Sequence, residues 1–195
     1  MRRQKLANDP AGYVEHAHEI NDLAKHALRL ETHDATYLAR KISLGLSLQA
    51  IELAGKGILF TMGETTADIR RKHKWHKLPE LLQVADNTLQ SRPEEELGKY
   101  HHFTLWFPII DGRQLNTTVA AYLKEHFSKG ASADSRNYFY PDEPVFTGPK
   151  PIQAISVIAD YLIQVAAEIE SLMKKITAQQ GTPADAETAM RPRRV

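Results

Sequence analysis

The residues between positions 70 and 77 have the types most directly suited to chemistry in this sequence. Five of these eight positions are basic, and the other three carry indole or imidazole rings: Arg70, Arg71, Lys72, His73, Lys74, Trp75, His76 and Lys77. A compact positive cluster with such rings suits contacts to phosphate groups and stacking of nucleobases. The alternative is a solvated connection between helices whose charges have no specific partner. The candidate ligand-binding residues of this basic segment are Arg70, Lys72, His73, Lys74 and Lys77.

Within the basic segment, Arg71 and His76 form a candidate catalytic pair for metal-independent cleavage of RNA. Four residues separate them. A histidine can act as general acid or base near neutral pH, and an arginine can stabilise the negative charge that develops on a phosphorane. The competing interpretation is that His76 caps or packs at the start of the next helix, because arginine and histidine often fall at this spacing by chance in a basic run.

Glu52 and Lys56 stand four residues apart in a strongly apolar stretch, so they are expected to form an i,i+4 ion pair on a largely buried helix. The cost of removing two charges from water often exceeds their attraction. Such a pair therefore specifies helix register or marks a functional groove. We keep both interpretations: a structural pair between bundle helices, and a pair of ligand-binding residues.

A proline-rich stretch near the C-terminal third contains a second candidate binding element. In residues 135–141, Arg136 stands close to Tyr138 and two further aromatic residues. An arginine beside aromatic rings can hold a nucleotide by stacking and phosphate contact. The alternative is that the aromatic side chains anchor this loop on the hydrophobic core. Arg136 and Tyr138 complete the set of candidate ligand-binding residues.

The first expected helix carries four potential metal ligands on one face: Glu15, His18, Asp22 and His26. Its Glu-x-x-His unit is the local pattern of di-iron helical bundles, which require a matching unit on a second helix. The sequence has no second such unit. We therefore expect a solvated polar face with i,i+4 pairs, and neither a metal nor a cofactor.

The elements that must position these side chains belong to a chain of ordinary composition. Its 195 residues are 42% hydrophobic and 25% charged, which is typical of a soluble globular protein. The net charge of +1 excludes a globally basic nucleic-acid binder but not a local basic patch. The lack of cysteine excludes disulfides and thiolate chemistry. Without a signal peptide or an apolar run of roughly 18 residues, we expect a cytoplasmic protein with no membrane contact.

Hydrophobic periodicity predicts an all-α fold, an up-and-down bundle of about five to six helices. Residues 1–178 are expected to form a single domain, and residues 179–195 a disordered tail. Gly63 is expected to cap the second helix, which is apolar around most of its circumference and should lie at the centre of the bundle. A short extended segment is expected within residues 100–111. The expected helices cover residues 10–31, 34–62, 79–89, 115–129 and 155–176, and a further short helix is expected to begin at Ser91.

Three segments of the sequence resemble the HEPN superfamily of small helical bundles. Residues 47–59 are similar to its "A-x-E-x-x-x-K-x-x-L" core helix and to the abortive-infection branch. Residues 74–81 resemble its "K-x-H-x-L-x-x-L" segment, and residues 136–141 resemble its "R-Y-P" approach to the final helix. The resemblance spans roughly residues 34–176. It implies a helical bundle that often dimerises, with roles in RNA cleavage, nucleotide binding or bacterial defence.

One departure from that family bears on activity. Active HEPN ribonucleases resemble one another in an Arg-x4–6-His element near the last helices, and none follows Arg136 here. We therefore expect an RNA- or nucleotide-binding homodimer with a role in bacterial defence or a toxin–antitoxin-type system. A metal-independent ribonuclease using Arg71 and His76 is the alternative. A structural protein–protein interaction module, with an acidic partner for the basic segment, is the third hypothesis.

Overall fold

The computed structural model describes residues 9–30, 36–73, 77–92, 116–127 and 149–180, together with the single positions 97, 105, 108, 109 and 112. The described residues contain six helices and no strand, so the predicted all-α bundle is confirmed. The helices are α1 (Pro10–Arg29), α2 (Thr36–Thr61), α3 (Thr66–His73), α4 (Leu78–Gln90), α6 (Val119–Phe127) and α7 (Pro149–Gln180).

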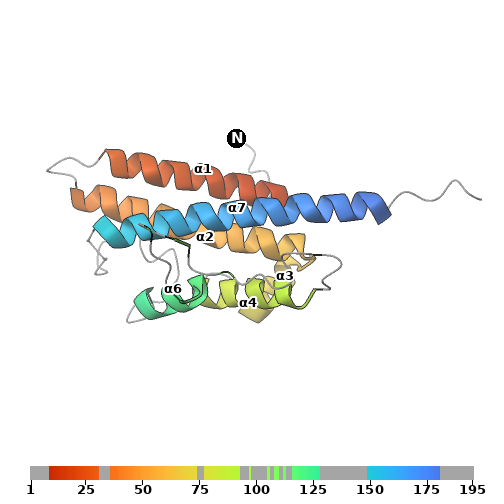
Figure 1. Ribbon diagram of the computed structural model, residues 1–195. Helices are drawn as coiled ribbons and strands as arrows, with labels where there is room; N and C mark the ends of the chain where they lie inside the picture. The colour runs from red at the N-terminus through yellow and green to blue at the C-terminus, as the bar shows by residue number, and fades with distance from the viewer. Residues whose placement is uncertain are drawn as a thin grey trace, which may run out of the picture.

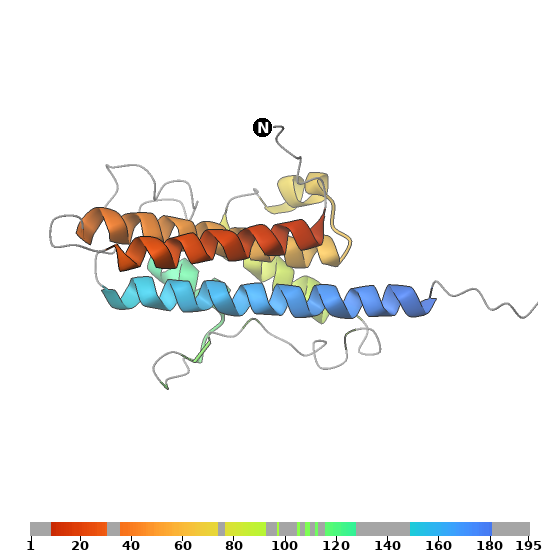
Figure 2. The ribbon, with the colours of Figure 1, turned by 90° about the horizontal axis from the view of Figure 1, so that it is seen from above.

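The three long helices α1, α2 and α7 each pack against the other two along their lengths (Figures 1 and 2). α2 and α7 run in the same direction and α1 in the opposite one, so the start of α1 meets the end of α2. The shorter helix α4 packs on α2, α6 packs on α4, and α3 lies where α2 ends (Figure 1). The last turns of α7 extend beyond the ends of both neighbours.

α2 is the central helix, as its wide apolar surface predicts. It packs on α1, α7 and α4. Five of its large apolar side chains are fully buried, whereas Leu38 and Ile42 near its start are exposed; the buried ones are Leu44, Leu48, Ile51, Ile58 and Leu59. Gly63 follows its end with a φ of +90°, a left-handed conformation that favours glycine. The amide of Gly63 donates to the Phe60 carbonyl at 3.0 Å, and that of Glu64 to the Leu59 carbonyl at 3.0 Å. The predicted glycine cap is therefore confirmed.

Two glycines let α2 approach its neighbours closely. A Cβ added at Gly55 would lie 3.0 Å from Cδ2 of Leu82 on α4. A Cβ added at Gly57 would lie 3.1 Å from Cγ2 of Val14 on α1. Lys56 stands between these glycines, so the backbone on either side of this lysine is held tightly against α1 and α4.

The helix α3 was not expected, because the sequence analysis placed no helix between residues 62 and 79. Residues 70–73, the first half of the basic segment, are the last four residues of α3. Thr65 and Asp68 form a capping box at its start: the Asp68 amide donates to Thr65 Oγ1 at 3.2 Å, and the Thr65 amide to Asp68 Oδ2 at 3.4 Å. The Thr-x-x-Asp spacing was the available signal. It is short, and no apolar periodicity accompanies it.

The other helix boundaries shift by a few residues. α6 begins at Val119 rather than near residue 115. α7 begins at Pro149, because prolines are tolerated in a first helical turn, and it continues to Gln180, past the expected start of the tail. The predicted helix after Ser91 and the extended segment of residues 100–111 lie mostly outside the described residues.

Among the described residues, two helices are long and apolar enough to cross a membrane by length and hydropathy alone. The candidate spans are Leu38–Thr61, with a mean hydropathy of 1.2 and 83% burial of its window, and Ile152–Gln179, with 1.4 and 56%. A core helix of a soluble bundle meets the same criteria. These helices are therefore weak evidence for a membrane span, and the cytoplasmic location stays a prediction.

A buried carboxylate ties α4 to the chain that follows it. Asp86 Oδ1 accepts a hydrogen bond from the Leu105 amide at 3.1 Å, and the Leu105 carbonyl accepts one from the Val119 amide at 2.9 Å. Burial raises the pKa of Asp86 above its usual value. Tyr161 is a residue of α7, and burial together with the negative charge of Asp86 raises its pKa to about 12.

The raised pKa of Tyr161 predicts a loss of stability in strong alkali. In the unfolded chain this phenol loses its proton near its ordinary pKa of 10.0, whereas in the folded chain it keeps the proton up to about pH 12. The stabilising effect is therefore complete below pH 10 and disappears as the pH rises toward 12.

Urea unfolding at several pH values should show this decline, and Tyr161→Phe should make it shallower. An unchanged decline in Tyr161→Phe would contradict the assignment. Burial also raises the pKa of Tyr13 and Tyr122, so part of the decline should persist.

Candidate functional site

The predicted ion pair between Glu52 and Lys56 is confirmed, and it is deeply buried. Lys56 Nζ donates a hydrogen bond to Glu52 Oε1 one helical turn away on α2. The two residues are 2% and 5% exposed. A ligand in solution cannot reach either group without displacing the helices around them. The burial therefore favours the structural interpretation of the pair.

Tyr13 connects this buried pair to the basic segment. Its ring is buried between α1 and α2, with its centroid 4.7 Å from that of Phe60. Burial raises its pKa, the positive charge of Arg70 lowers it, and the negative charge of Glu52 raises it. The phenol thus feels both Arg70 on α3 and Glu52 on α2. Arg70, the first residue of the basic segment, therefore lies within electrostatic reach of a core side chain that also senses Glu52.

Arg70 and Arg71 both present their side chains at the surface of α3. Arg71 is 74% exposed, and its Nη2 lies 3.0 Å from Oδ1 of Asp68. An exposed ion pair of this kind contributes little to stability, because water screens it and two flexible side chains must be ordered. Arg71 can therefore exchange Asp68 for another anion at little cost. Lys77 is half-buried immediately before α4.

The structure places only part of the predicted site. It brings together Glu52 and Lys56, and it sets Arg70 near the same end of the core. The backbones of Lys72 and His73 belong to α3, but their side chains lie outside the described parts. The remaining candidates also lie outside the described residues: Lys74, Trp75, His76, Arg136 and Tyr138. The geometry of the proposed catalytic pair, Arg71 and His76, therefore stays a prediction.

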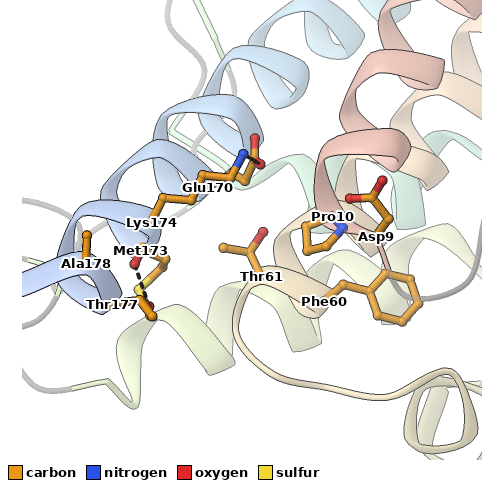
Figure 3. A pocket seen from close by; sticks show the side chains of 9 residues that line it. All are labelled: Asp9, Pro10, Phe60, Thr61, Glu170, Met173, Lys174, Thr177 and Ala178. Carbon is orange, nitrogen blue, oxygen red and sulfur yellow. Dashed lines mark hydrogen bonds and ion pairs between the residues drawn. The ribbon is translucent and has the colours of Figure 1, made fainter. Parts of the chain in front are cut away.

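A pocket of about 490 Å³ lies where the start of α1, the end of α2 and the second half of α7 meet (Figure 3). Phe60 and Met173 contribute to its apolar lining. At its rim, Lys174 Nζ lies 2.5 Å from Glu170 Oε1, and this carboxylate raises the pKa of Lys174. Asp9 adds a smaller effect in the same direction. This pocket could not be predicted from the sequence, because its three walls are far apart along the chain.

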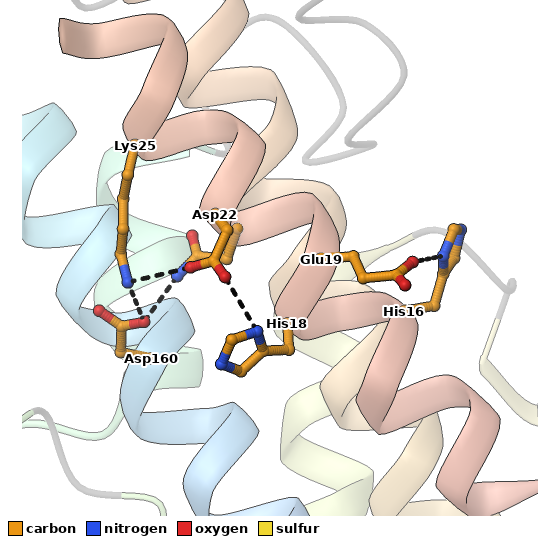
Figure 4. A network of polar contacts seen from close by, with 7 residues as sticks. His16, His18, Glu19, Asp22, Lys25 and Asp160 are labelled. Atoms are coloured by element: carbon orange, nitrogen blue, oxygen red, sulfur yellow. Dashed lines mark hydrogen bonds and ion pairs between the residues drawn. The ribbon is translucent and has the colours of Figure 1, made fainter.

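A polar network that the sequence did not predict links the three long helices, and Figure 4 shows its contacts between α1 and α7. Asn21 on α1 is buried, its Nδ2 donates to Asp160 Oδ1 on α7 at 2.8 Å, and its Oδ1 accepts from Ser47 Oγ on α2 at 3.2 Å. Lys25 Nζ reaches the same Asp160 oxygen at 2.6 Å. The sequence held a signal for this network, because Asn21 is a polar residue within the apolar stripe of α1. The network favours one register of the three helices, because a shift would leave buried polar groups unpaired.

The histidine-bearing face of α1 is a solvated surface, as the sequence analysis favoured. His18 Nδ1 lies 3.1 Å from Asp22 Oδ2, and His16 Nδ1 lies 3.3 Å from Glu19 Oε2 (Figure 4). All four side chains are well exposed. Within the described ranges, no group of three or more histidine, cysteine, aspartate or glutamate side chains could hold a metal ion.

These features define the class of the protein as an all-α helical bundle with a buried ion pair in its central helix and basic side chains at the adjoining corner. No protein-family model, no curated protein and no solved structure matches the chain.

Proposed function

We propose that this protein binds RNA or a nucleotide through the basic segment of residues 70–77. The observation that carries the proposal is the surface position of Arg70 and Arg71 on α3, in a segment with five basic and no acidic residues. Arginine donates several hydrogen bonds in a planar fork that matches the oxygens of a phosphate. The five cations within these eight residues could contact successive phosphates, although the net charge of the whole chain is only +1.

The exposed ion pair of Arg71 is compatible with this proposal. Asp68 is the carboxylate that pairs with Arg71, and it is also engaged by the cap of α3 through Thr65. Because the Arg71 pair is exposed, a phosphate can replace the carboxylate as its partner. The exchange keeps the α3 cap intact, since Thr65 and Asp68 continue to hold one another.

The resemblance to HEPN proteins extends this proposal. We include in it a cytoplasmic homodimer with a role in bacterial defence or a toxin–antitoxin-type system. Metal-independent cleavage of RNA by Arg71 and His76 is the alternative function. A structural module that meets an acidic protein is the third. These three functions differ in what they do to RNA, so RNA is the useful probe.

The proposal predicts that reversing the two exposed charges of α3 weakens RNA binding. In a fluorescence-anisotropy titration with a labelled single-stranded RNA, Arg70→Glu/Arg71→Glu should lower the affinity at least about tenfold at about 100 mM salt. The dependence of log affinity on log salt should become shallower by about 1.4, since two phosphate contacts are lost. The matched control is Arg29→Glu/Lys175→Glu, which makes the same change in net charge at exposed positions of α1 and α7. Equal losses in the two variants, or no binding by the wild type at low salt, would overturn the proposal.

Incubation of RNA with the protein in EDTA separates binding from cleavage. Cleavage by the wild type that disappears in His76→Ala would establish the ribonuclease alternative. Intact RNA with both proteins, together with the anisotropy result above, would leave a binding function.

A further inference from the structure

A second hollow lies between the first half of α4 and α6, with a volume of about 470 Å³. Its apolar lining consists of small or flat side chains, Pro79 and Val84 on α4 and Ala120 and Ala121 on α6. Such side chains leave room for a planar group to lie against them. The volume falls in the range of about 300–1,000 Å³ that small-molecule sites occupy.

The polar groups of this groove have a definite pattern. Glu80 and Gln83 lie one turn apart on α4, and Lys124 faces them from α6. Gln83 Nε2 donates to Asn87 Oδ1 at 3.1 Å, which leaves its carbonyl oxygen as the group that can accept from a ligand. The α4 side of the groove therefore offers acceptors, a carboxylate and an amide carbonyl, and the α6 side offers an ammonium donor.

The groove begins where the basic segment ends. Lys77 is the last residue of that segment, and Pro79, two positions later, already lines the groove. A ligand whose planar part lies in the groove can thus reach the basic segment with an anionic group. A planar ring joined to a phosphate is the chemistry of a nucleotide.

We propose that the groove between α4 and α6 is the base-binding subsite of this protein and that it prefers guanine. This inference rests on the proposed function and specifies which nucleotide that site selects. Guanine carries two adjacent N–H donors, which match the two oxygens of the Glu80 carboxylate, and its O6 accepts from Lys124. Adenine lacks this pair of donors and has an amino group where guanine has O6. The 5′-phosphate then lies toward Lys77, the described residue that ends the basic segment and precedes α4.

Titration of the full chain with GMP and with AMP, followed by calorimetry, tests the preference. The wild type should bind GMP about tenfold more tightly than AMP, the difference expected for one bidentate contact. Glu80→Gln should bring the two affinities to within about threefold, because an amide offers one acceptor where the carboxylate offers two. Ala121→Trp should weaken GMP binding about tenfold or more by filling the groove. Ala121 is exposed, so the fold should accept the larger side chain, and circular dichroism checks this.

The matched control is Glu125→Gln, an exposed carboxylate on α6 that does not line the groove. It should bind GMP like the wild type. Equal affinities for GMP and AMP in the wild type, or GMP binding that Glu80→Gln and Ala121→Trp leave unchanged, would overturn the inference. RNA binding that depends on Arg70 and Arg71 but not on Ala121 would overturn it while leaving the proposed function in place. RNA binding that Arg70→Glu/Arg71→Glu leaves unchanged would instead refute the proposed function.

Discussion

Replacing Lys56 by methionine is expected to lower the free energy of unfolding by about 3–5 kcal/mol. The substitution keeps much of the side-chain volume but removes the Lys56 ammonium from the buried Glu52 carboxylate. Removing one partner of a buried ion pair is costly, because water cannot reach the remaining charge to replace the lost contact. Urea unfolding followed by circular dichroism measures the change.

The double variant Glu52→Leu/Lys56→Met separates the pair from its surroundings. It removes both charges together, so it should be more stable than Lys56→Met alone. The matched control is Lys174→Met on α7, which breaks a Glu–Lys pair with the same i,i+4 spacing at the surface. This control should have little effect, because water already screens the exposed lysine. A loss in Lys56→Met no greater than in the control would show that the buried pair has no special role.

Asn21→Leu is the second substitution with a large expected effect, a loss of about 1–3 kcal/mol in the free energy of unfolding. Asn21 accepts from Ser47 and donates to Asp160, and a leucine does neither. Ser47 is fully buried, so its hydroxyl cannot turn to water for a replacement partner. Asp160 is half exposed and keeps Lys25, so it should lose less. Thermal and urea unfolding measure the loss.

A double-variant cycle identifies which contact of Asn21 matters. If the Ser47 hydroxyl accounts for the loss, Ser47→Ala should cost less in the Asn21→Leu background than in the wild type. Asn87→Leu serves as the control, since Asn87 is an exposed asparagine on α4 that also accepts a side-chain hydrogen bond. Additive losses, or a similar effect of Asn87→Leu, would contradict the role assigned to the buried network.

Features that depend on neighbouring residues along the chain were predictable. The bounds of α1, α2 and α4 fall within about two residues of their expected positions, because hydrophobic periodicity, proline and Gly63 are local signals. The pairing of Glu52 with Lys56 was also predictable, since residues four apart on a helix are adjacent. α3 was not predicted, because its polar residues carry no periodic apolar pattern and its one signal, the Thr65–Asp68 cap, is short.

Sequence by itself therefore determined the helical class, the central position of α2, the local Glu52–Lys56 pair and the concentration of positive charge in residues 70–77. Only the tertiary structure decided how deeply that pair is buried, because burial depends on how α1 and α4 close around Gly55 and Gly57. It also decided the partnership of Asn21 with Asp160, which stand 139 residues apart, and the groove between α4 and α6. The physical reason is the same in each case: hydrophobic spacing specifies a helix and its apolar face, whereas contacts between helices depend on their packing in three dimensions.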